Sequence, residues 1–471
     1  MKLKIKLPLV KKIVLLFLLF ILFFILISFN QNLAMYRKIK ELKAQGFRIT
    51  PEEFFTKCKD EDNALFVWEE IKNSIKIDKT EVDSWQIRRD IHFEKWDAVP
   101  KEHKNTLRKF LNSNTNVLPL LQKAVSLPCL TINPDFSKPM IKWTYPKFPA
   151  PDNIQLFIYP RGMLALDDGD VKSAKECCLL GFKIFNRFSK STTYGLWESY
   201  PTRNYDDSIR LLIEIIKSGN ADKSFLTEVF KMLDPEIFRT YCYNRYDFYR
   251  VMELNALYHY KNGNLNIKEL EDYLFEYPNI IHKITRRFIY PKVVFQRQDY
   301  MIFNLINLKK DPIIYRKWIN ESVAKFENSD DYFFLKYFRR SSNSDFNIIR
   351  SNLYDFTRLN IARLAVACKL YTMEHEKIPN SLDDLVPKYF EKLPIDIYSG
   401  KPYVYKILNN DGFVIYSLGE NGKDDIGNNK DIDAFIKIID AKDNPCDDFF
   451  WIGTPEGYLF EYDSFRNMGW V

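Results

Sequence analysis

The chain has 471 residues, of which 46% are apolar and 28% charged, and this composition excludes a disordered chain and provides for a sizeable core. Phe and Tyr are abundant, at 38 and 28 residues, whereas Gly is scarce at 15, which favours helices over a turn-rich β fold. The net charge of +7 is uneven, because residues 420–471 hold 12 acids and 5 bases. The basic excess in the rest of the chain can attract anionic lipid or nucleic acid. Its lysines are scattered, however, so we expect a solvated surface and no nucleic-acid partner.

The N-terminus has the layout of a membrane anchor. Residues 1–12 form a basic region with five lysines and no acid, and Ile13–Phe29 runs without a charge. Seventeen helical residues cover roughly 26 Å, close to the hydrocarbon thickness of a bilayer. We therefore predict a single transmembrane anchor over 13–29, with a cytoplasmic N-terminus and the bulk of the chain extracytoplasmic. A cleaved signal peptide is the alternative, although only Ala34 resembles a cleavage position.

Residues 36–340 are predicted to form a mainly helical extracytoplasmic body. The pattern predicts a basic helix up to Gly46 and a capping box from Thr50 to Glu53. Apolar spacing then predicts helices over 63–77, 101–127, 171–188, 206–217, 222–233 and 235–260. Six prolines between 128 and 151 predict an irregular segment, and the acids around Asp168 predict a turn and helix cap rather than a metal site. The polar run at 339–345 predicts the end of the body.

The last part of the chain, 346–471, is predicted to be a small α+β module. An amphipathic helix over 354–373 begins it, with one apolar stripe, and a short helix capped by Ser381 follows. A turn and strand within 393–408, an Asp411-Gly412 hairpin turn and a returning strand at 413–418 predict an antiparallel sheet. The loop after it, ENGKDDIGNNKDID, packs acids, amides and glycines into fourteen residues. The fold class is thus mainly α, with a small α+β C-terminal module.

Three motifs in this module, IPNSLDDLVPKY, the turn and strand from Pro394 to Tyr405, and YSLGENGKDDIGNNKDI, occur in a recognisable order. Residues 358–433, which contain them, resemble the C-terminal domain of the type II secretion pseudopilin G family. In that family the final loop holds a calcium ion that fixes the small sheet. The resemblance covers about one sixth of the chain.

The resemblance implies a calcium site in the acidic loop. Asn421 falls where the family usually has an acid, and Asp431 falls on the acid of a following Asp-Ile pair. Asp424 and Asp425 have no reliable counterpart and can compensate for the amide at Asn421. The chemistry agrees, because calcium takes six to eight oxygen ligands and glycines let a loop wrap closely around it. A solvated acidic loop is the alternative.

The chain also departs from that family. It lacks the Gly-Phe-x-x-x-Glu processing site, and over 320 residues separate the predicted anchor from the module helix. It therefore cannot assemble as the family's fibre subunit does. The whole chain is similar to a group of membrane-anchored bacterial envelope proteins of unassigned activity.

Cysteines, histidines and acids are the residue types most able to carry catalytic or metal chemistry in this chain. The seven cysteines show no C-x-x-C spacing, and one or two disulfides can form in an oxidising compartment, with no pairing determined. No zinc, nucleotide or hydrolase motif surrounds any of the histidines, which are at 92, 103, 259, 282 and 375. These observations favour a non-catalytic protein that binds or scaffolds an unidentified envelope partner. The alternative is an envelope hydrolase that uses carboxylates such as Glu198, Asp206 or Asp207 in a cleft of the helical body.

Overall fold

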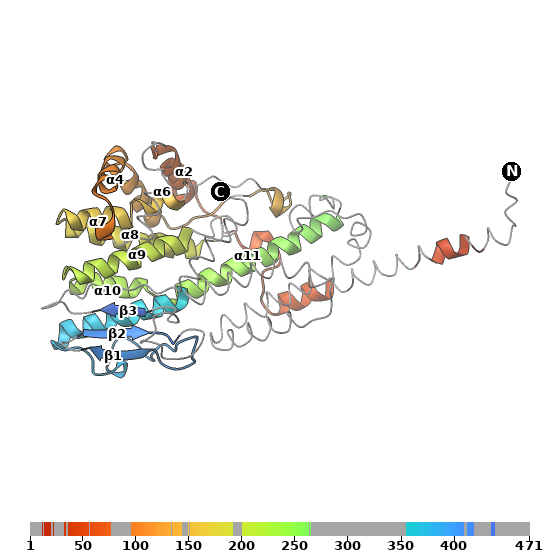
Figure 1. Ribbon diagram of the computed structural model, residues 1–471. Helices are drawn as coiled ribbons and strands as arrows, with labels where there is room; N and C mark the ends of the chain where they lie inside the picture. Colours follow the sequence, from red (N-terminus) through yellow and green to blue (C-terminus); the bar gives the residue numbers. More distant parts are fainter. Residues whose placement is uncertain are drawn as a thin grey trace, which may run out of the picture.

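The computed structural model describes residues 12, 14–19, 22, 33, 36–55, 57–76, 96–132, 134–143, 149, 151–191, 200–262, 264, 355–408, 412–418 and 435–438. Within these residues the protein is mainly helical and carries one small antiparallel sheet, as the sequence predicts. The helices lie side by side in the body, and the sheet lies on the side away from α2 and α4 (Figure 1).

Most of the predicted helices of the body begin and end within a few residues of the predicted positions, although α9 begins six residues before its predicted start. In chain order they are α2 (Ala64–Ser74), α4 (Lys101–Ser113), α5 (Val117–Ser126), α6 (Pro151–Gln155), α7 (Tyr159–Asp167), α8 (Val171–Lys190), α9 (Tyr200–Lys217), α10 (Lys223–Met232) and α11 (Pro235–Lys261). Asp170 caps α8 by accepting a hydrogen bond from the Ser173 N–H at 3.1 Å, and Asp222 caps α10 in the same way. The predicted role of the acids around Asp168 in a turn and cap is thereby confirmed.

Two further predicted elements differ in extent. The single helix predicted over 101–127 is wrong, because the chain turns between α4 and α5. Pro119 lies in the first turn of α5, where its missing N–H does no harm, whereas the same residue inside a longer helix would leave a carbonyl without its donor. The capping box at Thr50 forms, with its N–H donating to Glu53 at 3.1 Å, but it begins only one 3-10 turn, Pro51–Glu53.

Helices α7, α8 and α9 pack closely because two glycines lie between them. A Cβ atom on Gly181 of α8 would lie 1.9 Å from Ser208 Oγ of α9, and one on Gly162 of α7 would lie 2.2 Å from a Leu211 methyl group. A side chain at either position would force the neighbouring side chain or the facing helix to shift. The absence of Cβ atoms at these two positions therefore sets how near the helix backbones come.

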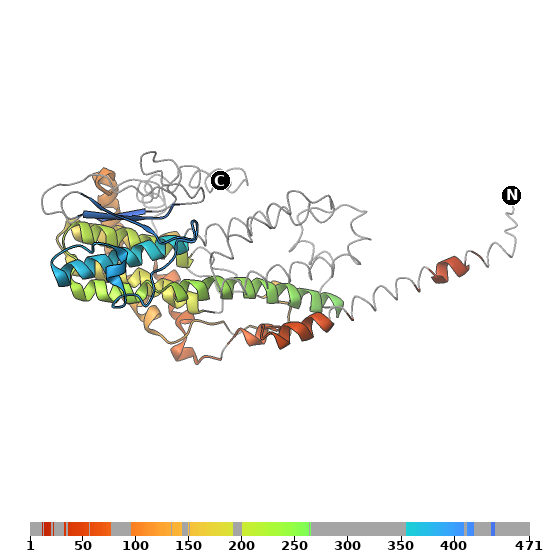
Figure 2. The ribbon, with the colours of Figure 1, turned by 90° about the horizontal axis from the view of Figure 1, so that it is seen from below.

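The helix 355–375 is buried on nearly all sides. The sequence predicts one apolar stripe, and that prediction is incomplete, because Leu364, Ala365 and Cys368 on other faces are also buried. Met373, at the end of the predicted helix, is 37% exposed. Several faces of the helix 355–375 are buried because helices of the body cover one face and the sheet covers another, as Figure 2 shows. Residues from Phe54 to Ile415 consequently belong to one hydrophobic core.

The sheet has three antiparallel strands in the order β1 (Val404–Leu408), β2 (Gly412–Tyr416) and β3 (Phe435–Ile438). The first hairpin pairs Leu408 with Gly412, so its connection is 409–411. β3 pairs Tyr416 with Phe435 and was missed by the sequence reading. The short helix at Ser381 is confirmed as a 3-10 turn, Leu382–Leu385, capped by its hydroxyl.

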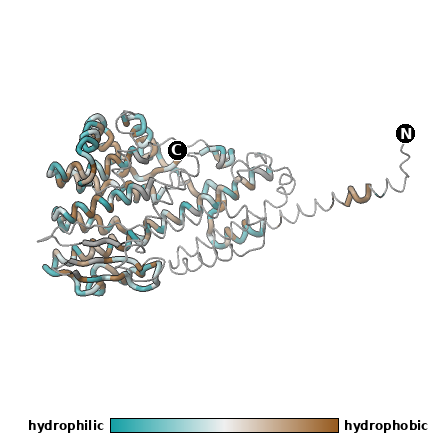
Figure 3. The backbone as a smooth tube through the Cα atoms, in the orientation of Figure 1, coloured by the Kyte–Doolittle hydropathy of each residue, from teal (hydrophilic) through white to brown (hydrophobic). Residues whose placement is uncertain are grey.

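Part of the predicted membrane anchor lies outside the described residues. Residues 14–19 are helical, apolar and lie apart from the folded body (Figure 3). Among the described residues, no helix is both long and apolar enough to cross a bilayer.

Candidate functional site

The predicted calcium loop is framed by described strands, although its four proposed ligands, Asn421, Asp424, Asp425 and Asp431, lie outside the described residues. The pairing of Tyr416 in β2 with Phe435 in β3 brings the two ends of the connection side by side. Ligands for a cation would thus come from one closed loop. In the described part of the chain, no group of three or more His, Cys, Asp or Glu side chains is placed to hold a metal.

Asp396 fixes the first residues of that loop. Its side chain is fully buried and accepts hydrogen bonds from the Ser417 hydroxyl at 2.8 Å and from the Leu418 N–H at 3.3 Å. It also accepts from the Tyr398 N–H at 3.0 Å and from the Ser399 hydroxyl at 2.7 Å. Four donors satisfy the buried carboxylate, which is why it can stay in the core.

The role of Asp396 was not recognised from the sequence. The sequence did contain a local signal for a turn, because an Asp followed shortly by Ser399 and Gly400 is typical of an Asx turn. What the sequence did not indicate is the long-range contact with Ser417, 21 residues away. Asp396 therefore joins the turn before β1 to the end of β2.

Two of the three carboxylates proposed for a hydrolase, Asp206 and Asp207, lie on α9. The third, Glu198, is outside the described residues. Asp206 forms an ion pair with Arg358 of the helix 355–375, with Oδ1 and Nη1 2.6 Å apart. Asp355 lies 4.0 Å from the same guanidinium, and Asp207 lies 3.8 Å from Arg210. The structure thus brings Asp206 and Asp207 together on one helix, but each faces an arginine.

The ion pair of Asp206 with Arg358 connects α9 to the helix 355–375. The Arg358 side chain is only 6% exposed and draws Asp206 from α9 toward the helix 355–375. Tyr205 beside it is fully buried, and this burial raises the pKa of its hydroxyl well above the ordinary value. A carboxylate held by a guanidinium is a poor proton acceptor, because the positive charge favours its ionised form. The contacts are those of an interhelical ion pair.

The three described histidines, His103, His259 and His375, lie on different helices and form no metal-holding group within the described residues. His259 on α11 is buried, and burial lowers the pKa of its imidazole, while the nearby Glu52 has the opposite effect. His375 is exposed at the end of the helix 355–375 and its ring lies against Tyr371, with centroids 4.2 Å apart. His103 is half-buried on α4, and His92 and His282 are outside the described residues.

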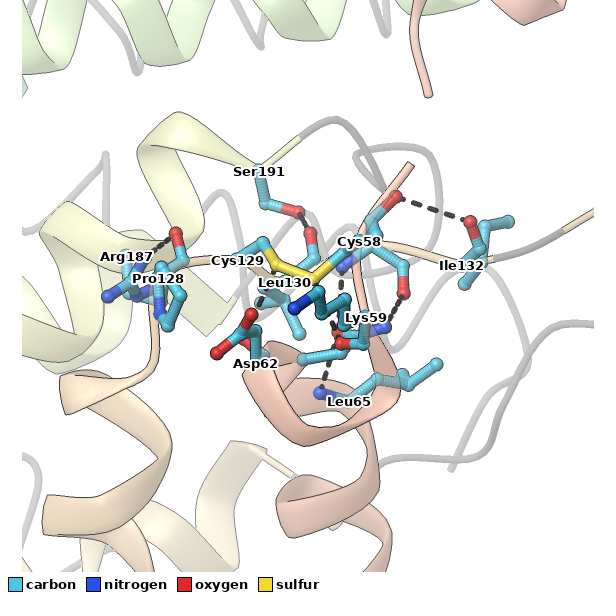
Figure 4. The surroundings of a disulfide bond; sticks show 12 residues. Cys58, Lys59, Asp62, Leu65, Pro128, Cys129, Leu130, Ile132, Arg187 and Ser191 are labelled. Carbon is cyan, nitrogen blue, oxygen red and sulfur yellow. Dashed lines mark hydrogen bonds between the residues drawn. A yellow bond between two sulfur atoms is a disulfide. The ribbon is translucent and has the colours of Figure 1, made fainter. Parts of the chain in front are cut away.

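A disulfide joins Cys58 and Cys129, which are 71 residues apart (Figure 4). The backbone brings these cysteines together, because Asn63 and Cys129 form an isolated parallel β-bridge and the Ala64 N–H donates to the Cys129 carbonyl at 2.8 Å. Arg187 of α8 holds the same segment by donating to the Pro128 carbonyl at 2.7 Å. The disulfide thus sits in a hydrogen-bonded crossing of two chain segments.

The other described cysteines are buried thiols. Cys177 and Cys178 lie on α8, Cys242 on α11 and Cys368 on the helix 355–375. Burial raises the pKa of Cys177 to about 12 and the pKa values of the other three above their ordinary range. Such thiols form little thiolate at neutral pH and are unreactive. Cys368 is fully buried and belongs to the hydrophobic core.

The segment after the predicted anchor is attached to α11. Leu42 and Ile49 form a small apolar cluster with Leu254 of α11. Arg48 approaches Asp247 of α11 at 3.4 Å, and Arg250 donates to the Arg48 carbonyl. The helix 36–44 is therefore packed against the folded body rather than joined to it by a free linker.

Comparisons with protein-family models, with curated proteins and with solved structures find no match to this chain.

Proposed function

We propose that this protein is a single-pass membrane-anchored envelope protein whose body lies on the outer side of the membrane and binds or scaffolds another envelope component. The observation that carries the proposal is the disulfide between Cys58 and Cys129. Disulfides persist in oxidising compartments and are rare in the cytoplasm. Its position shortly after the predicted anchor supports an extracytoplasmic location for the chain that follows.

The described part of the apolar N-terminal segment supports anchoring. The side chains of Leu15, Leu16 and Phe17 are 57 to 67% exposed, although each is strongly apolar. Apolar surface of this kind is costly in water and is stable in the hydrocarbon of a bilayer. The residues 14–19 are helical, which satisfies the backbone hydrogen bonds that lipid cannot.

A binding role agrees better with the side chains than hydrolysis does. Asp206 is engaged with Arg358 at 2.6 Å and Asp207 lies beside Arg210, so neither is arranged as a general base near a second, protonated acid. The packing of the helix 36–44 on α11 supports a scaffold, because it gives the body a fixed attachment near the membrane.

We further propose calcium as the ligand of the loop with Asn421, Asp424, Asp425 and Asp431. The loop closes between paired residues of β2 and β3, and Asp396 holds its first residues. A bound calcium ion would neutralise the carboxylates that crowd this loop. No catalytic step is assigned to it.

The location is tested in intact cells that have an envelope. We expect the full chain to remain in the membrane after alkaline carbonate extraction. After the outer layers of the envelope are permeabilised, protease added to the cells should cut the chain on the outer side of this membrane. Peptide mapping without reduction should recover Cys58 linked to Cys129. Extraction by carbonate, or recovery of both thiols free, would contradict the proposed location.

The binding role is tested by partner capture. Cross-linking in cells, followed by purification of the full chain, should recover a defined envelope protein. The Asp206→Asn variant should recover the same partner if the cluster is an interhelical joint. Isolation of the bare monomer in repeated experiments would argue against a binding role.

Calcium is tested on the full chain in detergent by thermal unfolding with calcium and with chelator. A ligand that binds only the folded form stabilises it by about 2.7 kcal/mol at one hundred times its Kd. Asp431→Asn should abolish the upward shift, and Glu61→Gln, which changes an exposed acid on another part of the chain, should retain it. Equal shifts in the wild type and Asp431→Asn would refute the assigned site.

A further inference from the structure

The helix 36–44 presents basic side chains away from the body. Its apolar residues Ile39 and Leu42 face α11, whereas Arg37, Lys40 and Lys43 are exposed. The helix has one acid, Glu41, and it lies 3.4 Å from Lys38. Among the described residues, no carboxylate lies within ion-pair distance of Arg37, Lys40 or Lys43. The exposed face of this helix is therefore positively charged.

Two exposed tyrosines lie at the same end of the molecule. Tyr36 is 66% exposed and Tyr258 of α11 is 55% exposed, the highest values for aromatic residues in the described part of the chain that follows the predicted anchor. The helix 36–44 begins, and α11 ends, on the side where the N-terminal segment approaches the body (Figures 1 and 2).

The helix geometry places both tyrosines at one level. Leu42 and Leu254 belong to one apolar cluster, and the two helices extend from it toward the N-terminal segment (Figures 1 and 2). At roughly 1.5 Å per residue, Tyr36 lies about 9 Å beyond Leu42 and Tyr258 about 6 Å beyond Leu254. The two tyrosines thus lie at a similar height, at the end of the body where the N-terminal segment approaches it.

We propose that this end of the protein, formed by Tyr36, Arg37, Lys40, Lys43 and Tyr258, binds the headgroups of anionic phospholipids next to the anchor. Basic side chains near a membrane surface attract anionic lipids, and tyrosine rings favour the headgroup level. The surface therefore holds the body upright on the membrane. This inference rests on the proposed anchoring by residues 13–29.

The experiment uses the full chain in vesicles of phosphatidylcholine with a minority of phosphatidylglycerol. Spin-labelled versions of both lipids report, by electron paramagnetic resonance, the ratio of their association with the protein. The test variant carries Arg37→Gln, Lys40→Gln and Lys43→Gln. The control carries Lys101→Gln, Lys109→Gln and Lys123→Gln, three exposed lysines of α4 and α5. The lysines of residues 1–12 are unchanged in all three proteins, so only differences between proteins are interpreted.

We expect the wild type to prefer phosphatidylglycerol at low salt and to lose the preference at high salt. The test variant should show at least a fivefold smaller preference, because each base near an anionic surface contributes roughly a fivefold factor. The control should match the wild type, and all three should have the same melting temperature.

Equal ratios in the wild type and the test variant, in vesicles that keep the protein after carbonate extraction, would overturn the lipid site while leaving the anchor intact. Loss of the wild type on carbonate extraction would overturn both. An unchanged ratio combined with a lost cross-linked partner in the test variant would assign the surface to a protein and overturn the lipid proposal.

Discussion

Arg250 and Asp247 lie one turn apart on α11 and form a fully buried ion pair, with Nη2 and Oδ1 2.6 Å apart. The same guanidinium donates to the backbone carbonyl of Arg48, and its Cζ atom lies over the Phe47 ring, 5.4 Å from the centroid. The pair therefore ties the segment after the predicted anchor to the longest helix of the described body. A buried pair of this kind tolerates the loss of neither partner.

The first prediction concerns this pair. Asp247→Ala should destabilise the protein by about 3 to 5 kcal/mol, because the Arg250 guanidinium would remain in the core without its carboxylate. Denaturant unfolding of the full chain measures the change. Glu61→Ala removes one member of an exposed pair with Lys59 and should change the free energy of unfolding by less than about 1 kcal/mol. Similar values for the two variants would show that the buried pair is not a stabilising contact.

The second prediction concerns the disulfide. The double change Cys58→Ser and Cys129→Ser should lower stability by about 4 kcal/mol, the value that loop closure over 71 residues gives. Unfolding with and without a reducing agent measures it, and the wild type in the reducing agent should match the double variant.

The four buried thiols, Cys177, Cys178, Cys242 and Cys368, should resist alkylation in the folded protein, because they are buried and their thiols have raised pKa values. Rapid labelling of these four would contradict the packing.

The third prediction concerns the contact of α8 with α9. Gly181→Ala should cost about 1 to 3 kcal/mol, because the new methyl group would meet Ser208 Oγ. Ser208→Ala in the same chain should recover part of the loss, since it removes the hydroxyl that lies nearest. A double-mutant cycle on denaturant unfolding gives the coupling between the two positions. A coupling of zero would mean that the helices separate freely at this point.

The fourth prediction concerns pH. Hydrogen bonds from Lys388, Tyr389 and Lys223 to Glu374 lower the pKa of its carboxyl to about 2. Because the folded pKa lies below the ordinary value of about 4.5, the stabilisation is complete above pH 4.5 and is lost as the pH falls toward 2.

Glu374→Gln should therefore cost on the order of 1 to 2 kcal/mol at neutral pH, since it removes the acceptor of these bonds. The difference from the wild type should shrink steadily below pH 4.5. Urea unfolding at a series of pH values measures it, with Glu61→Gln as the control for the loss of one negative charge. A difference that stays constant down to pH 2 would rule out the ion contacts as its source.

The fifth prediction concerns Asp396. Asp396→Asn should destabilise the protein by about 2 to 3 kcal/mol, because the amide group replaces one oxygen that accepts from two donors. Asp97→Asn, at an exposed position, is the matched control. Thermal unfolding measures both. If Asp396→Asn is as stable as the control, the four hydrogen bonds do not stabilise the start of the predicted calcium loop.

Local signals in the sequence were sufficient for the helices. The spacing of apolar residues, the caps at Asp170 and Asp222, and the glycines after helix ends depend on contacts within a few residues. These elements formed at nearly the predicted positions. The apolar run at 13–29 is equally local, and it remains the basis of the proposed anchor.

The tertiary structure determined which elements and side chains contact one another. Burial of all faces of the helix 355–375 depends on the sheet and body that cover it, and no periodicity in its own residues reports them. The contacts of Asp206 with Arg358 and of Asp396 with Ser417 join residues 152 and 21 positions apart, and many other acids could have been chosen. The Cys58–Cys129 pairing likewise depends on the crossing at Asn63. Sequence spacing determines which side chains share a helix face, whereas the partner across space is selected by packing, because only the folded chain brings distant residues within bonding distance.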